Sequence, residues 1–87
     1  MKLVFHRDFV KTYRQLKLTE KTRFRERLRL FSADPFDPIL NNHPLAGRYG
    51  GYRSINIGGD LRAIYKHLPG EICIFVTIGT HHQLYGR

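Results

Sequence analysis

This 87-residue chain contains one cysteine, no tryptophan and only seven acidic residues. Cys73 cannot close a disulfide within the chain, and its place in an apolar run predicts a buried thiol. The chain also lacks the run of about 18 apolar residues that a membrane-spanning helix needs. We therefore expect a soluble, unprocessed, cytoplasmic protein that makes no use of a membrane, with one core and one domain over residues 1–87.

The scarcity of acidic residues leaves the chain strongly basic. Fifteen Lys and Arg give a formal net charge of +8 and a pI near 10.2. Such a field on a small surface attracts polyanions, and nucleic acid is the leading partner. An acidic protein or an anionic membrane surface would respond to the same field, so charge alone does not identify the partner.

Helical spacing dominates the first third of the chain. Lys2 to His6 predicts a strand, and the apolar residues after it predict a helix that carries Phe9, Val10, Tyr13 and Leu16. A second helix is predicted from an N-cap at Thr19 to an end between Ser32 and Pro35, with its buried face at Phe24, Leu28 and Phe31. The two helices are expected to form a hairpin that packs on one sheet.

Turn residues and strand patterns alternate in the rest of the chain. Residues 34–51, rich in Pro, Asn, Asp and Gly, predict a surface loop, either a plain connector or a loop that carries function. Strands are predicted at 52–57, 61–66 and 72–78, joined by glycine-containing turns as an antiparallel meander. The expected fold class is α+β, in the order β-α-α-β-β-β.

The five histidines show no zinc-ligand spacing, so we expect no metal and no other cofactor. Neither a nucleotide-binding glycine motif nor a serine or cysteine triad signature is present. RNA can nevertheless be cleaved when a base removes a 2′-hydroxyl proton, an acid protonates the leaving oxygen and cations stabilise the phosphorane. His43 in the loop and His81 after the last strand are candidates for the proton transfers, because imidazole titrates near operating pH.

Two groups of basic residues are candidates for phosphate contact. Strand alternation puts Arg62 on one side of a central strand with Ile64 and Lys66, where an unpaired arginine is costly. We therefore predict that Arg62 binds phosphate rather than forming a structural ion pair. Lys21, Arg25 and Arg29 recur every four residues on the second helix, either as a solvated face or as a contact surface for RNA phosphates.

Four segments in order resemble the motifs of the YafQ toxins, within the wider RelE superfamily. They are His43-Pro44-Leu45-Ala46-Gly47, Gly51-Tyr52-Arg53, Asp60-Leu61-Arg62-Ala63-Ile64-Tyr65-Lys66, and Gly79-Thr80-His81 with Leu84-Tyr85-Gly86. The resemblance implies a microbial-RNase-like RelE fold in which two helices pack on an antiparallel sheet. It also implies cleavage of mRNA in the ribosomal A site by 2′-hydroxyl attack, and a cognate antitoxin in a hetero-oligomeric complex.

The resemblance also implies roles at individual positions. The catalytic residues that it implies are His43 in the loop, Asp60 after the hairpin turn and His81 after the last strand. It also implies that Arg62 in a strand stabilises phosphate and that Tyr85 stacks on a base. The two histidines are expected to share the acid and base roles, in an order that the sequence does not assign, while Asp60 either orients one imidazole or takes a proton itself. We further expect RNA contacts from Arg53, Lys66 and His82, together with Lys21, Arg25 and Arg29.

Two positions depart from the family pattern. The strand after Gly-Tyr-Arg carries an Asp and then a His in YafQ toxins, whereas this chain has Ser54 and Asn56. Neither replacement acts as a general base near neutral pH. Two other functions therefore stay open: a ParE-like toxin that poisons DNA gyrase without cleaving RNA, and a non-cleaving module that binds RNA or the ribosome.

Overall fold

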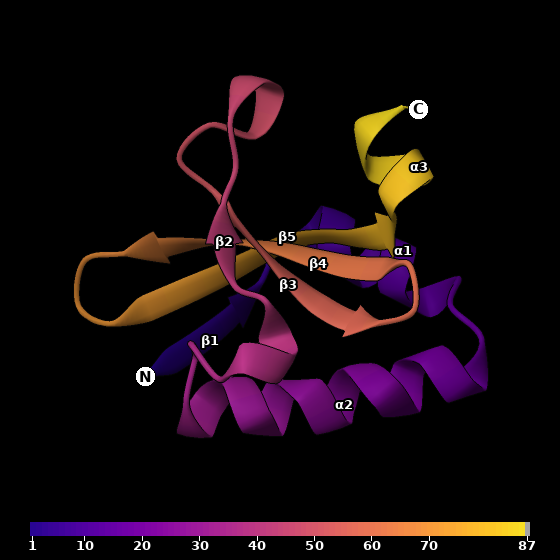
Figure 1. The fold of residues 1–87 in the computed structure, drawn as a ribbon, viewed down its shortest axis with the longest axis horizontal. Coiled ribbons are helices and arrows are strands. Elements are labelled where there is room, and N and C mark those ends of the chain that lie inside the picture. Colours follow the sequence, from indigo (N-terminus) through magenta and orange to yellow (C-terminus); the bar gives the residue numbers. More distant parts are fainter. Residues whose placement is uncertain (87) are drawn as a thin grey trace.

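A five-stranded sheet organises the chain (Figure 1). The computed structural model describes residues 1–86. In sheet order the strands are β1 (Lys2–Phe5), β5 (Ile72–Thr80), β4 (Leu61–Leu68), β3 (Arg53–Gly58) and β2 (His43–Pro44). Strands β3, β4 and β5 form the predicted antiparallel meander, and β2 extends it. The sheet is not wholly antiparallel, because β1 pairs in parallel with β5.

Two longer helices, α1 (Arg7–Arg14) and α2 (Leu18–Ala33), form the predicted hairpin, and a short third helix, α3 (His81–Tyr85), follows β5. The predicted N-cap at Thr19 is wrong. The N-cap is Lys17, two residues earlier, and α2 begins at Leu18, because the Glu20 carboxylate accepts a hydrogen bond from the Lys17 backbone N–H at 2.9 Å. None of the helices in residues 1–86 combines the length and apolar character that a membrane crossing requires.

The segment predicted as one long loop contains three short elements. They are the 3₁₀ turns η1 (Pro38–Leu40) and η2 (Gly47–Tyr49) and, between them, strand β2. His43 therefore lies in a strand, where it is paired with Ser54 of β3. The prediction of an irregular connector is wrong here, because a two-residue strand has no periodicity that a sequence could show.

Aromatic rings fill the core between the helix hairpin and the sheet. Phe9 of α1 packs on Phe24 of α2 and on Phe75 of β5, with ring centroids 5.3 and 5.9 Å apart. Phe31 contacts Tyr65 at 4.9 Å, and it is fully buried. Burial of each such side chain contributes about 1.5–3 kcal/mol, so these rings hold both helices on one face of the sheet.

The opposite face of the sheet is free of α1 and α2, and we call it the open face. Leu61, Ala63 and Tyr65 belong to the core, so alternation along β4 turns Arg62 and Ile64 to the open face. Figure 1 shows α2 below the sheet, while the η2 segment and α3 rise above it. These two projections flank the open face.

Gly58 is the position where we expect the backbone to tolerate a side chain least. It lies at a bulge of β3 with a φ of +141°, and an added Cβ would overlap the Cδ of Arg23 on α2. Gly58→Ala is expected to lower the free energy of unfolding by about 1–3 kcal/mol, measured by urea denaturation. Gly59→Ala is the control, because it has a positive φ of +54° but open space around it. Equal losses in both variants would show that the contact with Arg23 contributes nothing.

Candidate active site on the open face

Two rows of residues form the floor of the site. Cross-strand pairing aligns His43 with Ser54, Ser54 with Ile64, and Ile64 with Thr77. The neighbouring row aligns Asn56, Arg62 and Gly79. Paired residues lie on the same face of a sheet, so the predicted loop histidine and the predicted phosphate-binding arginine share the open face.

The His43 ring is oriented by the backbone that precedes it. Its Nδ1 lies 2.8 Å from the carbonyl oxygen of Asn41, a residue in the left-handed conformation with a φ of 44°. A carbonyl oxygen only accepts hydrogen bonds, so Nδ1 carries the proton. In the neutral ring the lone pair then resides on Nε2, which is the tautomer that a general base requires.

Arg62 is held by neutral groups only. Its Nη1 donates to Oδ1 of Asn56 at 3.0 Å and to the carbonyl oxygen of Gly59 at 3.1 Å. Within residues 1–86 the one ion pair, between His6 and Asp8, lies elsewhere. The guanidinium is thus positioned without an anionic partner, as the prediction of a phosphate contact rather than an ion pair requires.

His81, Asp60 and Tyr85 meet where β5 passes into α3. The backbone N–H of His81 donates to the carbonyl oxygen of Asp60 at 3.1 Å. The His81 and Tyr85 rings, one turn apart on α3, have centroids 4.6 Å apart. The helix is started by a capping box, in which Thr80 Oγ1 accepts from the Gln83 N–H at 3.1 Å. This cap fixes the direction in which His81 leaves the sheet.

Ser54 and Asn56 replace the family's Asp and His with groups that have other roles. Asn56 Oδ1 accepts from the Gly58 N–H at 3.0 Å as well as from Arg62, so it braces both the bulge and the arginine. The Ser54 hydroxyl is fully buried, with no hydrogen-bond partner in the described part of the chain. Asn56 is therefore a positioning residue for Arg62.

The site also contains residues that the sequence analysis did not single out. Tyr49 of η2 contacts Tyr52 at 6.3 Å and Tyr85 of α3 at 6.1 Å, so the two projections above the open face touch through it. Arg48 lies 5.4 Å from the Tyr49 ring centroid. Basic and aromatic residues that alternate beside a glycine-rich turn were the available sequence signal.

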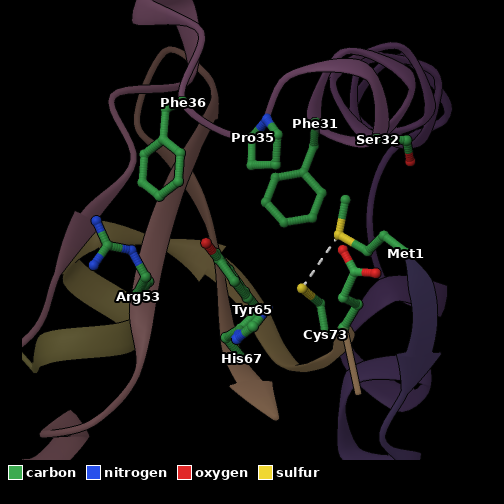
Figure 2. Close-up of a pocket in the computed structure, with 10 residues that line it drawn as sticks. Met1, Phe31, Ser32, Pro35, Phe36, Arg53, Tyr65, His67 and Cys73 are labelled. Atoms are coloured by element: carbon green, nitrogen blue, oxygen red, sulfur yellow. Dashed lines mark hydrogen bonds between the residues drawn. The ribbon is translucent and has the colours of Figure 1, made fainter. Parts of the chain in front are cut away.

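Arg53, a predicted RNA contact, lies on the helix side of the sheet. Figure 2 shows it beside Phe36 at a cavity of about 590 Å³ that Phe31 and Tyr65 also line. Its Nε donates to the Asn42 Oδ1 at 2.8 Å, and the Asn42 amide donates to the Tyr65 hydroxyl at 2.8 Å. Because Asn42 precedes His43, Arg53 secures the segment that carries the histidine and is not brought together with Arg62.

The basic stripe of α2 is likewise separate from the open face. Lys21 lies 5.7 Å from the ring centroid of Tyr13, and Arg25 donates to the Tyr13 hydroxyl at 3.1 Å. These contacts, like the exposed Arg29, belong to the helical side of the molecule. Of the other predicted RNA contacts, Lys66 lies on the open face, 5.4 Å from the Tyr52 ring centroid, and His82 is exposed on α3.

Burial affects two ionisable groups on the helix side. Desolvation raises the pKa of the Cys73 thiol, which is buried as the sequence predicted, and it also raises the pKa of the Tyr65 phenol. Both groups are therefore protonated at neutral pH. Across residues 1–86, no three His, Cys, Asp or Glu side chains come together as a possible metal site.

The fold is similar to those of bacterial toxins of known structure. The fold matches the crystal structure of YafQ from Escherichia coli BL21(DE3), with a TM-score of 0.81, 24% identity and 98% of both chains covered. A YoeB/ParE toxin from Agrobacterium tumefaciens matches with a TM-score of 0.75 and 22% identity, over 93% of this chain and 99% of that one. The E. coli DinJ–YafQ complex gives 0.70 and 26%, over 98% of both chains. The fold is that of the RelE-like toxins, as the sequence predicted.

The sequence is similar to that of one family of these toxins. A family model described as the bacterial toxin of type II toxin-antitoxin system, YafQ, matches residues 1–86. The mRNA interferase toxin YafQ of E. coli K12 is 36% identical over 52 residues, which is 60% of this chain and 55% of that protein. Its counterpart in E. coli BL21(DE3) is 28% identical over 94% of this chain and 88% of that protein. The chain belongs to the YafQ family of type II toxins.

Proposed function

We propose that this toxin is a ribosome-dependent endoribonuclease that cleaves mRNA in the A site. The observation that carries the proposal is that two residues share one face of the sheet in neighbouring rows: a histidine whose Nδ1 bonds to a carbonyl oxygen, and an arginine without an anionic partner. The curated relatives are named mRNA interferase toxins. In this proposal His43 and His81 supply the base and the acid and Arg62 the cation, which are the groups that RNA cleavage needs.

In the proposed mechanism His43 is the general base. Its Nε2 removes the proton of a 2′-hydroxyl, and the 2′-oxygen attacks the adjacent phosphorus. The bond from phosphorus to the 5′-oxygen then breaks, and His81 supplies the proton that the leaving oxygen takes up. The products are a 2′,3′-cyclic phosphate and a 5′-hydroxyl.

Three other residues support this reaction. Arg62 stabilises the negative charge that develops on the phosphorane. Tyr85 stacks on a base. The Asp60 carboxylate orients the His81 imidazole, which lies beside it because the Asp60 carbonyl accepts a hydrogen bond from the His81 backbone N–H. Lys66 and His82 bind the RNA strand near the site, while Lys21, Arg25 and Arg29 on the far side contact ribosomal RNA.

A cognate antitoxin is the second proposed partner. A family relative has been solved as the DinJ–YafQ complex, and an archaeal RelE as a complex with RelB. A toxin with a net charge of +8 attracts an acidic segment, which would neutralise the surface and block access of RNA.

The main alternative keeps the fold and changes the target. A YoeB/ParE toxin shares the architecture, so the fold alone does not separate a ribonuclease from a gyrase poison. His43, His81 and Arg62 favour the ribonuclease, since a binding poison needs no base, acid or phosphate clamp. DNA damage with intact message would favour the gyrase target instead, and ribosome binding without cleavage would favour a non-catalytic module.

Primer extension on a defined message in a purified translation system tests the proposal. Wild-type toxin is expected to cut within A-site codons only when ribosomes are present, because the small site cannot align free RNA as well. His81→Gln should slow cutting roughly 100-fold, which is the lower end of the effect of a positioned acid, since the ring is exposed. Absence of cuts by well-folded wild-type protein would overturn the proposed function.

A further inference from the structure

The rings of Tyr52, Tyr49, Tyr85 and His81 form a continuous aromatic row above the open face. Successive centroids lie 6.3, 6.1 and 4.6 Å apart, and the tyrosine pairs meet almost perpendicularly, at 81° and 85°. Rings that meet edge to face leave ring surface that no parallel neighbour covers. A flat base can lie on such a surface without first separating a stack.

Two cations accompany the end of the row that is remote from His81. Arg48 lies 5.4 Å from the Tyr49 centroid, and Lys66 lies 5.4 Å from the Tyr52 centroid. Neither forms an ion pair with a carboxylate of the described residues. Aromatic rings beside unpaired cations are the combination with which proteins bind single-stranded nucleic acid.

A cavity of about 450 Å³ adjoins this end of the row, within the size range of small-ligand sites. Arg48, Tyr49, Tyr52 and Thr77 line it, together with Asp8 at the start of α1. Thr77 is two residues from Gly79, the cross-strand partner of Arg62. Two residues span about 6.8 Å along an antiparallel strand, which a single nucleotide step can bridge.

We propose that Tyr49 and Tyr52, with Arg48 and Lys66, form a second stacking subsite, which binds the nucleotide next to the one whose phosphate lies at Arg62. The subsite rests on the proposed ribonuclease function. Stacking on tyrosine tolerates any base, so this subsite adds affinity and alignment rather than sequence preference. Tyr85 would hold one base and the Tyr49–Tyr52 pair the neighbouring one.

Asp8 favours RNA over an acidic peptide as the occupant. An acidic antitoxin segment would also be drawn to Arg48 and Lys66, but its carboxylates would meet a carboxylate in the same cavity lining, that of Asp8, whose Oδ2 lies 3.7 Å from Nδ1 of His6. A nucleotide instead presents ribose hydroxyl and base N–H donors, which a carboxylate accepts. The lining therefore suits a ligand that carries both a negative phosphate and neutral hydrogen-bond donors.

Binding of a short fluorescein-labelled RNA with methylated 2′-hydroxyls, followed by anisotropy at low salt, tests the subsite apart from cleavage. Tyr49→Leu and Tyr52→Leu are each expected to raise Kd roughly 5- to 100-fold, the effect of losing one stacked base. Tyr49→Phe keeps the ring and should bind within about twofold of wild type. Phe36→Leu is the matched control, because Phe36 is an exposed ring beside an arginine on the opposite side of the sheet.

Each leucine variant must unfold at the same urea midpoint as the wild type. If one leucine variant unfolds, the other leucine variant, compared with Tyr49→Phe, still tests the subsite. Folded leucine variants that bind this RNA as tightly as wild type would overturn the subsite, including the case in which they lose affinity only for the antitoxin. If they lose RNA affinity while wild type cuts no message on ribosomes, the proposed cleavage fails but the subsite stands. If wild type cuts message and RNA affinity is unchanged in the variants, only the subsite fails.

Discussion

Replacing His43 by glutamine is expected to slow message cleavage on the ribosome by about 10²- to 10⁴-fold. Glutamine can still hydrogen-bond in this position, but it has no basic nitrogen to remove the 2′-hydroxyl proton. The loss should appear in the single-turnover rate and not in RNA affinity, because the backbone pairing of His43 with Ser54 does not depend on the side chain. Quench-flow cleavage of a programmed ribosome at saturating toxin measures that rate.

His67→Gln provides the control for this experiment. His67 is exposed on β4 and lines the helix-side cavity, so the same chemical change should leave the cleavage rate within about twofold of wild type. A His43→Gln variant that cleaves at nearly the rate of wild type would remove His43 as the base. The proton acceptor would then have to be sought at Asp60 or His81.

Arg62→Ala should reduce the cleavage rate by roughly 10²- to 10³-fold, the effect of removing one positioned charge from a transition state. Arg62→Lys retains the positive charge but loses the planar guanidinium that contacts Asn56 and Gly59, so an intermediate rate is expected. Asn56→Asp would supply the anionic partner that Arg62 lacks. It should slow cleavage although the guanidinium stays in place.

Arg14→Ala is the matched control for the charge itself, since Arg14 is exposed at the end of α1. It removes one positive charge and should slow cleavage only slightly, and less so as salt is raised. If Arg62→Ala and Arg14→Ala had the same effect, Arg62 would contribute only to the general field. The specific role at the phosphorane would then be lost.

The regular part of the fold was predictable because its sequence periods are long and clear. Phe24, Leu28 and Phe31 share a helix face, and the turns at Gly59 and Gly70 separate the strands of the meander. The direction of β1 was not predictable, because a strand pattern does not reveal its partner. Helix α3 was missed although Thr80 and Gln83 have the capping-box spacing, since five residues are too few for a helical period.

Candidate site residues could be named from the sequence where one residue type pointed to one chemistry. Arg62 was singled out as a charge in a central strand, His43 as a histidine in the long loop and His81 as a histidine after the last strand. The orientation of His43 depends on the carbonyl of Asn41 in a left-handed conformation, which no sequence pattern indicates. Arg53 was assigned to RNA by its motif, whereas its contact with Asn42 places it in the support of the loop.

The pairing of β1 with β5 has a consequence for the synthesis of this protein. Lys2 pairs with Ile72 and Phe5 with Phe75, so one of the first segments made waits for one of the last. Contacts so distant in the chain raise the entropy cost of closure and slow folding. A nascent chain that has not reached β5 lacks the strand on which α1 packs, and with it Gly79, the cross-strand partner of Arg62, and the segment from which α3 begins. Under the proposed function, the ribosome that makes this toxin would therefore be spared its activity during elongation.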